Sequence, residues 1–274
     1  MKFNHIRYGS GQPLLLIHGI GGSWRSWIPV LDRLSAHREL IVIDLPGHGK
    51  TPPLEGPTTI YTLADAVTEF LERNDLKGID VVGSSMGGRL VLELARRGGV
   101  VGAVVSLDPG GFWDGWERPF FHRTGALSVR LLRALKFGLP ALTDNVLTRS
   151  LLLAQLSVKP WDVTPRMALT ELKSIATTPV YDELLHDLAY GQEQEGADRG
   201  SIAKPFMIGW GRQDRVCFPS QAKKALHFFP DAHVYWFNRC GHFPHWDKPA
   251  ETIALILRVT TVAVPEKASE EHLT

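Results

Sequence analysis

Short apolar runs alternate with amphipathic segments over residues 14–108 of the chain. Runs that are apolar throughout, instead of alternately apolar and polar, are typical of parallel strands that are buried on both faces. Four such runs occur, at 14–17, 40–43, 80–82 and 101–107. The pattern predicts an α/β fold of the doubly wound type, in which helices cover both faces of a mostly parallel sheet of about seven to eight strands.

A helix is expected between the second and third of these runs. Leu63, Val67 and Phe70 recur at helical spacing, so they would lie on one helix face that packs on the sheet. Thr62, followed by Asp65 three residues later, predicts the N-terminal cap of this helix.

The rhythm of strand and helix stops after Gly110, where aromatic residues crowd together. Four segments of helical periodicity follow, at 125–137, 142–155, 164–176 and 178–190. At Thr164 and Thr178 a capping residue directly precedes proline, which is the preferred order at a helix start. The interruption predicts an inserted all-helical cap, or lid, over residues 111–201.

The strand and helix rhythm resumes after the predicted cap. Strands are expected at 205–210 and 233–237, and helices at 219–229 and 249–262. The core domain should therefore comprise residues 1–110 and 202–264. The last residues, 265–274, are polar and rich in charge, so they have little to bury and we expect a disordered tail.

Composition and charge narrow the classes of function. With 274 residues, of which 44% are hydrophobic, the chain can bury one large core. Its 30 basic and 29 acidic residues leave a net charge of +1, too small to favour nucleic acid or an anionic membrane as a partner. No apolar run reaches the roughly 18 residues of a membrane span, and Lys2 is not followed by the apolar segment of a secretory signal. We expect a cytoplasmic monomer or homodimer that acts on a small molecule.

Two cysteines, Cys217 and Cys240, have neither the CxxC spacing of a metal or redox site nor a secretory context. Thiols that are buried or have no functional role are therefore favoured over a disulfide or a metal site. The sequence predicts no metal and no cofactor.

A nucleophile motif follows the third apolar run. Gly83-Ser84-Ser85-Met86-Gly87 fits the pattern G-x-S-x-G between a β-branched strand and a helical stretch, the context that the motif requires. A serine hydroxyl becomes a good nucleophile only where a base can take its proton, and a tight strand-to-helix turn holds it at such a point. Ser85 is the expected nucleophile, because Ser84 lacks glycine two residues before and after it.

This turn closely resembles the nucleophile elbow of the α/β-hydrolase superfamily, and further matches cover nearly the whole chain. Residues 18–23, with the sequence HGIGGS, are similar to the family's oxyanion loop. By that resemblance, the backbone N–H groups of Ile20 and Met86 would form the oxyanion hole. Residues 44–49, DLPGHG, are similar to an architectural turn of the family, so the histidine of each segment is expected to be structural.

His242 is the expected general base. Its loop, residues 239–246, resembles the family's catalytic histidine loop, and the order Ser, Asp, His along the chain is that of this fold. His245 is the weaker rival. The family places the acid after either of two strands, and Asp108 and Asp214 occupy those two places. Asp214, in the arrangement G-x-x-D, is the preferred acid, and Asp108 stays the alternative.

The leading hypothesis is a serine hydrolase, specifically a carboxylesterase, that cleaves small to medium esters with a hydrophobic acyl or alkyl group through an acyl-enzyme on Ser85. One alternative is a carbon–carbon bond hydrolase of ring-cleavage diketones, which Cys240-Gly241-His242, with Trp246 four residues after the base, also resembles. A haloperoxidase side activity and a weakly catalytic small-molecule receptor on the same fold are further alternatives. Dehalogenases and epoxide hydrolases of the superfamily carry Asp at the elbow, so Ser85 excludes them.

Two groups of residues have an open role. Arg89, four residues after Ser85, would either hold a substrate carboxylate or be a paired helix residue. The aromatic residues at the start of the predicted cap and within it would either line an apolar pocket or form the cap's own core. They are Phe112, Trp113, Trp116, Phe120, Phe121 and Trp161.

Overall fold

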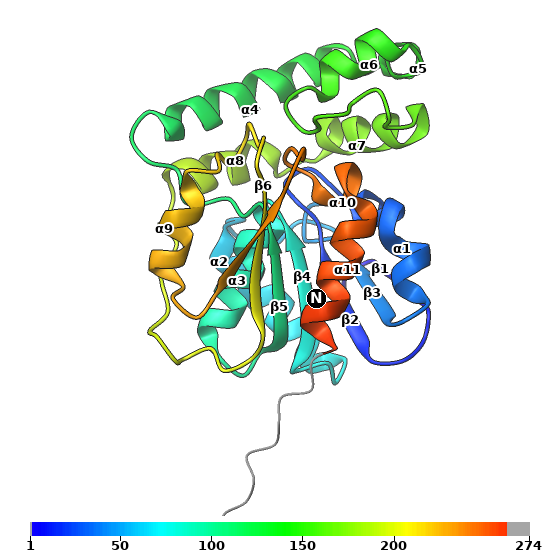
Figure 1. Cartoon of the computed structure of the whole chain (residues 1–274). Helices are drawn as coiled ribbons and strands as arrows, with labels where there is room; N and C mark the ends of the chain where they lie inside the picture. The colour runs from blue at the N-terminus through cyan, green and yellow to red at the C-terminus, as the bar shows by residue number, and fades with distance from the viewer. Residues whose placement is uncertain (1, 262–274) are drawn as a thin grey trace, which may run out of the picture.

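A seven-stranded sheet forms the centre of the computed structural model, which describes residues 2–261 (Figure 1). The strand order is β1-β3-β2-β4-β5-β6-β7, in which β1 is antiparallel to β3 and the other neighbours are parallel. The strands are β1 (His5–Tyr8), β2 (Pro13–Ile17), β3 (Glu39–Ile43), β4 (Ile79–Ser84), β5 (Val101–Leu107), β6 (Phe206–Gly211) and β7 (His233–Phe237). The predicted α/β fold with a mostly parallel sheet is confirmed, with seven strands.

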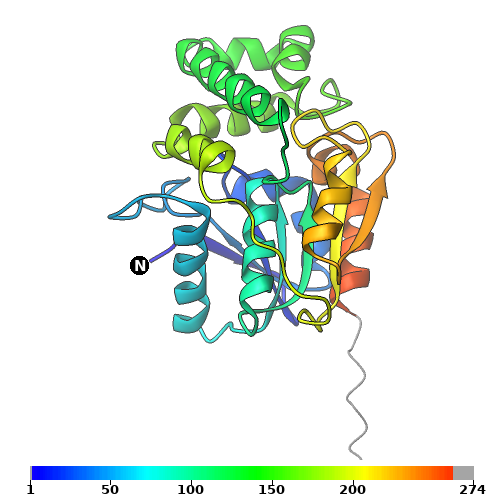
Figure 2. The ribbon, with the colours of Figure 1, turned by 90° about the vertical axis from the view of Figure 1, so that its left-hand side faces the viewer.

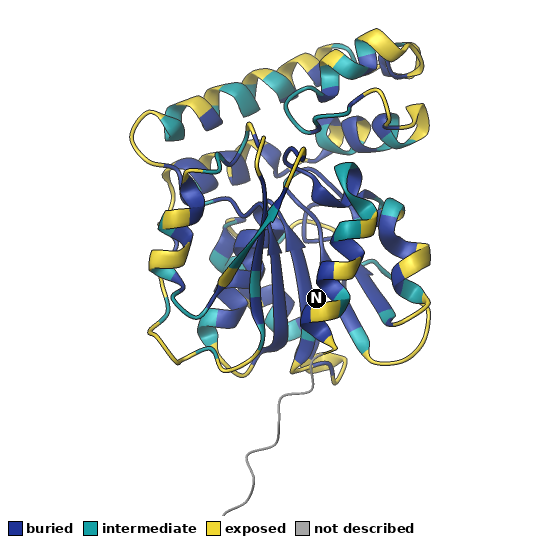
Figure 3. Cartoon of the chain, in the orientation of Figure 1, coloured by how far each residue is buried: buried dark blue, intermediate teal, exposed yellow. Residues whose placement is uncertain are grey.

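Helices cover both faces of this sheet (Figure 2). One face carries α1 (Ile28–Ser35) and α11 (Pro249–Thr260), and the other carries α2 (Ile60–Arg73), α3 (Met86–Arg97) and α9 (Gln221–Phe228). In β2, Leu14 and Leu16 pack with α1 and α11, whereas Leu15 and Ile17 pack with α2 and α3. Because both faces are covered, the central strands are buried along their length (Figure 3), which explains the unbroken apolar runs.

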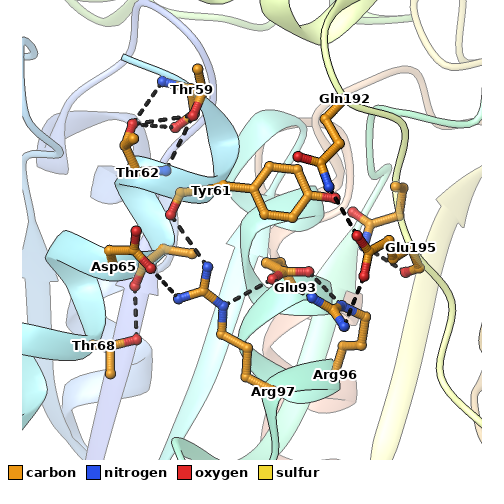
Figure 4. Close-up of polar contacts among 12 residues, drawn as sticks. Thr59, Tyr61, Thr62, Asp65, Thr68, Glu93, Arg96, Arg97, Gln192 and Glu195 are labelled. Atoms are coloured by element: carbon orange, nitrogen blue, oxygen red, sulfur yellow. Dashed lines mark hydrogen bonds and ion pairs between the residues drawn. The ribbon is translucent and has the colours of Figure 1, made fainter. Parts of the chain in front are cut away.

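Helix α2 is capped three residues earlier than predicted. Thr59 is the cap, and its side chain and that of Thr62 each accept a hydrogen bond from the other's backbone N–H, at 3.2 and 2.9 Å (Figure 4). The prediction of Thr62 as the cap is wrong because either threonine can serve, and the earlier start brings Ile60 into the core. Asp65 instead forms an ion pair with Arg97 of α3 at 2.6 Å.

In the described part of the chain, five helices connect β5 to β6 and lie over the carboxyl ends of the strands (Figure 1). They are α4 (Glu117–Ala134), α5 (Leu139–Asp144), α6 (Val146–Leu153), α7 (Pro165–Thr177) and α8 (Tyr181–Tyr190). These cap helices fall within residues 111–201. Thr164 caps α7 as predicted, but the prediction that Thr178 caps α8 is wrong, since its hydroxyl donates to the carbonyl of Ser174 at 2.9 Å.

An apolar cluster joins the cap helices to the sheet domain. Leu132 of α4, Leu153 of α6 and Leu172 of α7 belong to one buried cluster with Phe243 and Trp246. Both aromatic residues follow β7: Phe243 directly precedes the short helix α10 (Pro244–Asp247), and Trp246 lies within it. Removal of this apolar surface from water holds the cap helices against the loop that contains His242.

The predicted tail, 265–274, lies outside the described residues, as do the last three residues of the predicted core domain, 262–264. Among the helices of residues 2–261, none has the length and apolar character needed to cross a membrane.

A buried carboxylate ties α3 to its surroundings (Figure 4). Glu93 accepts hydrogen bonds from Arg96 at 2.8 and 2.9 Å and from Arg97 at 2.8 Å. Arg96 also pairs with Glu195 at 3.0 Å, in the segment before β6. Burial raises the pKa of Glu93, but the hydrogen bonds from the two guanidinium groups outweigh burial and lower the pKa below its ordinary value. The carboxylate is therefore ionised and holds both arginines.

We expect Glu93→Leu to lower the free energy of unfolding by about 2 kcal/mol, because two partly buried guanidinium groups lose their shared carboxylate. The matched control is Glu72→Gln, which breaks an exposed ion pair with Lys77 and should change stability by less than about 1 kcal/mol. Urea denaturation measures both effects. Equal losses in the two variants would contradict the stabilising role of the buried carboxylate.

Candidate active site

The nucleophile motif forms a strained turn between β4 and α3. Ser85 has φ 58° and ψ −117°, a backbone conformation with positive φ that residues other than glycine rarely adopt. A Cβ atom on Gly83 would lie 2.0 Å from the carbonyl oxygen of Gly87, and one on Gly87 would lie 2.4 Å from that of Ile17. Both positions therefore require glycine, and the turn holds the Ser85 hydroxyl at the carboxyl edge of the sheet.

Three of the predicted site residues meet at this edge. The Oγ atom of Ser85 lies 2.8 Å from Nε2 of His242, and Nδ1 of His242 lies 2.8 Å from Oδ2 of Asp214. The three residues are buried, and Ser85 is the most exposed of them at 8%. In this geometry His242 donates its Nδ1 proton to the carboxylate and accepts a hydrogen bond from the serine hydroxyl at Nε2.

Backbone groups hold Asp214 and His242 in place. Oδ1 of Asp214 accepts hydrogen bonds from the N–H groups of Val216 at 2.7 Å and Cys217 at 3.1 Å. The N–H of His242 donates to the carbonyl of Leu156, in the segment after α6, at 3.0 Å. Asp214 is thus fixed by its own loop, and His242 by the cap.

The rival candidates do not take part in this chain of contacts. Asp108 is fully buried at the end of β5, where its Oδ1 accepts a hydrogen bond from the N–H of Gly211 at 2.8 Å. Within residues 2–261, no hydrogen bond joins Asp108 to His242. The ring of His245 packs on that of Trp27 at 4.7 Å, and burial lowers the pKa of His245 to about 3.

The histidines of the two glycine-rich segments are buried and neutral. Nε2 of His18 accepts a hydrogen bond from the N–H of Leu45 at 3.1 Å, which joins the loop after β2 to the loop after β3. Burial lowers the pKa of His18 to about 4 and that of His48 to about 3. Both side chains therefore pack and bond as uncharged rings.

The predicted oxyanion loop lies directly against Ser85. A Cβ atom on Gly19 would approach Cβ of Ser85 to 3.1 Å, a tight contact, so glycine there lets the loop backbone come this close without a shift of Ser85. Gly19, Ile20 and Ser85 line one cavity. Met86 is the first residue of α3, where backbone N–H groups have no partner within the helix and attract anions.

Helix α7 of the cap is hydrogen-bonded to this loop and to the short helical turn that follows it. The Ser174 hydroxyl donates to the carbonyl of Gly22 at 3.1 Å, and the hydroxyl of Ser26 donates to Oε2 of Glu171 at 2.8 Å. Glu171 is buried, and sequence reasoning missed it. A usable signal was present, since Glu171 stands on the apolar face of its helix, three residues after Ala168.

The cavity over Ser85 is small and uncharged. Its volume is about 100 Å³, and His242 is the only titratable side chain other than Tyr181 among the described residues that line it. The cap contributes apolar side chains and three neutral polar ones, Thr124, Ser128 and Gln155. A larger hollow of about 660 Å³ lies beside Trp246, but its lining includes neither Ser85 nor His242. The smaller cavity is therefore the candidate site.

The residues of open role fall mostly outside this cavity. Of the six aromatic residues, Phe121 alone lines it within the described part of the chain. Phe112 and Trp113 are buried in the main core, whereas Trp116 and Trp161 are exposed. The guanidinium of Arg89 donates to the carbonyl groups of Leu188 and Gln192, at 3.4 and 2.6 Å, so it is a paired helix residue.

The side chains of Asp214, Cys217 and His242 bring their ligand atoms within 4.8 Å of one another, as a metal site would. The donor set nevertheless fits a metal poorly. Both carboxylate oxygens of Asp214 already accept hydrogen bonds, and burial raises the pKa of the Cys217 thiol well above its ordinary value. A protonated thiol is a weak ligand.

Burial raises the pKa of Glu171 from 4.5 to about 7, against the opposing hydrogen bond from Ser26. A carboxyl group whose pKa is higher in the folded state stabilises the protein when protonated, and this contribution is lost as pH rises through the folded pKa. We therefore expect Glu171→Gln, which cannot ionise, to gain stability relative to the wild type between about pH 4.5 and pH 8, by up to about 3 kcal/mol. Urea denaturation across this pH range measures the difference, with the exposed Glu72→Gln as control. A difference that does not change with pH would contradict the prediction.

Comparison with known proteins agrees with this architecture. Residues 12–249 match the sequence profile of the alpha/beta hydrolase fold family. One relative is a dihydrolipoyllysine-residue acetyltransferase component of an acetoin cleaving system from Cupriavidus necator. It is 28% identical over 93% of this chain, and the match spans 66% of the relative's length. Lipase 3 of Moraxella sp. is 28% identical over 86% of the chain and 73% of the relative.

Among solved structures, a meta-cleavage product hydrolase from Pseudomonas fluorescens IP01 superposes with a TM-score of 0.71, at 21% identity, and covers 94% of this chain and 93% of that one. At this identity the likeness concerns the fold alone. The sequence profile spans most of the chain, from β2 to the start of α11, and includes the elbow, the oxyanion loop and the loops of Asp214 and His242. The protein belongs to the alpha/beta hydrolase fold family.

Proposed function

We propose that the protein is a serine hydrolase that cleaves carboxylic esters through an acyl-enzyme on Ser85. The observation that carries the proposal is the unbroken pair of 2.8 Å contacts from Ser85 through His242 to Asp214. A serine hydroxyl is a weak nucleophile until a base takes its proton, and an oriented imidazole beside a carboxylate is such a base.

In the first half-reaction, Oγ of Ser85 attacks the ester carbonyl carbon while Nε2 of His242 takes the hydroxyl proton. The N–H groups of Ile20 and Met86 hold the oxygen on which negative charge develops. His242 then gives its proton to the departing alkoxide, and the acyl group stays on Oγ. Asp214 keeps the imidazole in the correct tautomer and stabilises its charged form.

In the second half-reaction, water takes the place of the alcohol. Nε2 of His242 removes a proton from the water as its oxygen attacks the acyl carbon, and the same oxyanion hole holds the new charge. Collapse of this intermediate returns the proton to Oγ of Ser85 and releases the carboxylic acid. The scheme needs no metal and no cofactor.

The cavity supports a small, neutral acyl group. A volume of about 100 Å³ holds a short chain, and the apolar side chains of Phe121, Leu132 and Leu172 favour a hydrophobic one. Thr124, Ser128 and Gln155 add neutral polar groups on the cap side of the cavity.

The second candidate is hydrolysis of a carbon–carbon bond in a ring-cleavage diketone, the activity that the name of the Pseudomonas fluorescens protein suggests. One observation counts against it. Such products carry a carboxylate, and no basic side chain other than His242 is present in the described lining of the cavity. The name of the Moraxella relative, a lipase, supports the ester hypothesis.

We expect Ser85→Ala and His242→Ala each to lower kcat on short p-nitrophenyl esters by at least about 10⁴-fold, and Asp214→Asn by about 10⁴-fold, because the three groups act as one unit. Ser84→Ala is the matched control: its side chain is buried beside Ser85 but lies outside the contact chain, so turnover should persist. A fluorophosphonate probe should label the wild type and Ser84→Ala, but not Ser85→Ala.

Two results would overturn parts of this proposal. A wild-type protein that folds but is neither labelled nor active on esters, lactones and diketones would favour a small-molecule receptor. Activity on diketones alone would favour the carbon–carbon hydrolase.

Cavity size predicts a preference for short acyl chains. We expect kcat/KM to be highest for acyl groups of about four carbons or fewer, and Leu132→Ala on α4 to raise the relative kcat/KM for longer chains by about tenfold, because it enlarges the cavity by about three methylene groups. Leu131→Ala is the matched control, since Leu131, the exposed neighbour of Leu132, does not line the cavity. An ester series of increasing acyl length measures the preference. An identical chain-length profile in the two variants would contradict the cavity as the acyl site.

A further inference from the structure

Both places at which this fold can carry the acid are occupied, and the two carboxyl groups lie side by side. Asp108 follows β5, and Asp214 follows the neighbouring strand β6. The N–H of Asp108 donates to the carbonyl of Gly209 at 2.8 Å, and Oδ1 of Asp108 accepts from the N–H of Gly211 at 2.8 Å. The side chain of Asp108 is also within hydrogen-bonding reach of the Asp214 carboxyl.

The second oxygen of Asp108 has no donor. Oδ2 is buried, and no N–H or O–H group of the described residues reaches it. Two ionised carboxylates cannot donate to each other, so an ionised Asp108 would leave a buried negative charge beside that of Asp214. Such a pair is stable only when it shares one proton.

The surroundings decide which carboxyl group holds that proton. Asp214 accepts from two backbone N–H groups and from Nδ1 of His242, all of which stabilise its ionised form. Asp108 has the single N–H of Gly211. Burial raises the pKa of Asp108 well above its ordinary value, and the Asp214 carboxylate raises it further.

The other groups that face Asp108 do not change this balance. Asp247 adds a further negative charge, and its carboxylate already accepts from the N–H of Gly241 at 2.7 Å. The thiols of Cys217 and Cys240 are uncharged, since burial raises the pKa of each well above its ordinary value. His242 is the only basic group in this set, and its Nδ1 is bonded to Asp214.

We propose that Asp108 is a neutral carboxylic acid that donates its proton to Asp214 and so positions the acid of the reaction. The inference rests on the proposed function, in which Asp214 orients His242. Asp108 is a positioning residue, because it acts on the imidazole only through Asp214. Its hydrogen bond fixes the Asp214 carboxylate against the sheet edge, which holds the acceptor of the Nδ1 proton of His242 in place.

The test compares Asp108→Asn with Asp108→Leu. The amide retains an N–H donor toward Asp214 and a carbonyl oxygen for the N–H of Gly211, so we expect kcat/KM within about threefold of the wild type. The acid limb of the pH profile of kcat/KM for Asp108→Asn should move by less than about 0.3 pH unit. Leucine has no donor, so kcat should fall at least about tenfold and the acid limb should move to higher pH.

Ser106→Ala is the matched control, because Ser106 in β5, two residues before Asp108, is also buried and polar, and its hydroxyl donates to the carbonyl of Gly88 at 3.0 Å. It should leave the pH profile unchanged even where it lowers stability. If Asp108 were ionised instead, Asp108→Asn would remove a negative charge near His242 and move the acid limb about one unit lower. That shift, or an inactive Asp108→Asn beside an active Asp214→Asn, would overturn the proposal.

Infrared spectroscopy tests the proton without any substrate. Glu171 contributes a partly protonated carboxyl group near neutral pH in both proteins, so the test is the difference spectrum of the wild type minus Asp108→Asn, which should retain a protonated-carboxyl band. That difference band together with no hydrolytic activity would overturn the proposed function but keep the proton assignment. Absence of the difference band at neutral pH would overturn the proton assignment alone.

Discussion

The parallel register of the central strands determines where the chemistry of this molecule lies. β2, β4, β5 and β6 run in the same direction, so their carboxyl ends meet at one edge of the sheet. The loops that leave these four ends carry Ile20, Ser85, Asp108 and Asp214, in that order along the chain. Hydrogen bonds between the strands fix the spacing of four side chains that the sequence scatters over about two hundred residues.

The cap helices are part of the site as well as its cover. The carbonyl of Leu156 accepts from the N–H of His242, and α7 is hydrogen-bonded through Ser174 and Glu171 to Gly22 and to Ser26, just beyond the loop of residues 18–23. The loop of His242 and the loop of residues 18–23 are therefore both held by the cap segment. A change in how the cap packs would alter both loops together, which links its stability to the geometry around Ser85.

Most of the fold and the main contacts of the site could be predicted from the sequence, since each depends on a local pattern. Unbroken apolar runs mark buried parallel strands, and the glycines around Ser85 mark a turn that no other residue permits. The predicted N-terminal residue of α2 is wrong because Thr59 and Thr62 have the same side chain, so either can cap the helix. Glu171 stands on the apolar face of its helix, but its hydrogen-bond partner Ser26 is far away in the chain, so the sequence could not show what it binds. The proximity of Asp108 and Asp214 likewise arises only when β5 and β6 pair.

In the proposed reaction, Ser85 carries the acyl group during turnover. Mixing the protein with a short p-nitrophenyl ester, quenching in acid within the first turnover and sequencing peptides by mass spectrometry locates any covalent intermediate. We expect an acyl group on the peptide that contains Ser85, its loss at later times, and none in Ser85→Ala. Rapid ester turnover with no adduct at any quench time, or with an adduct on another residue, would contradict it.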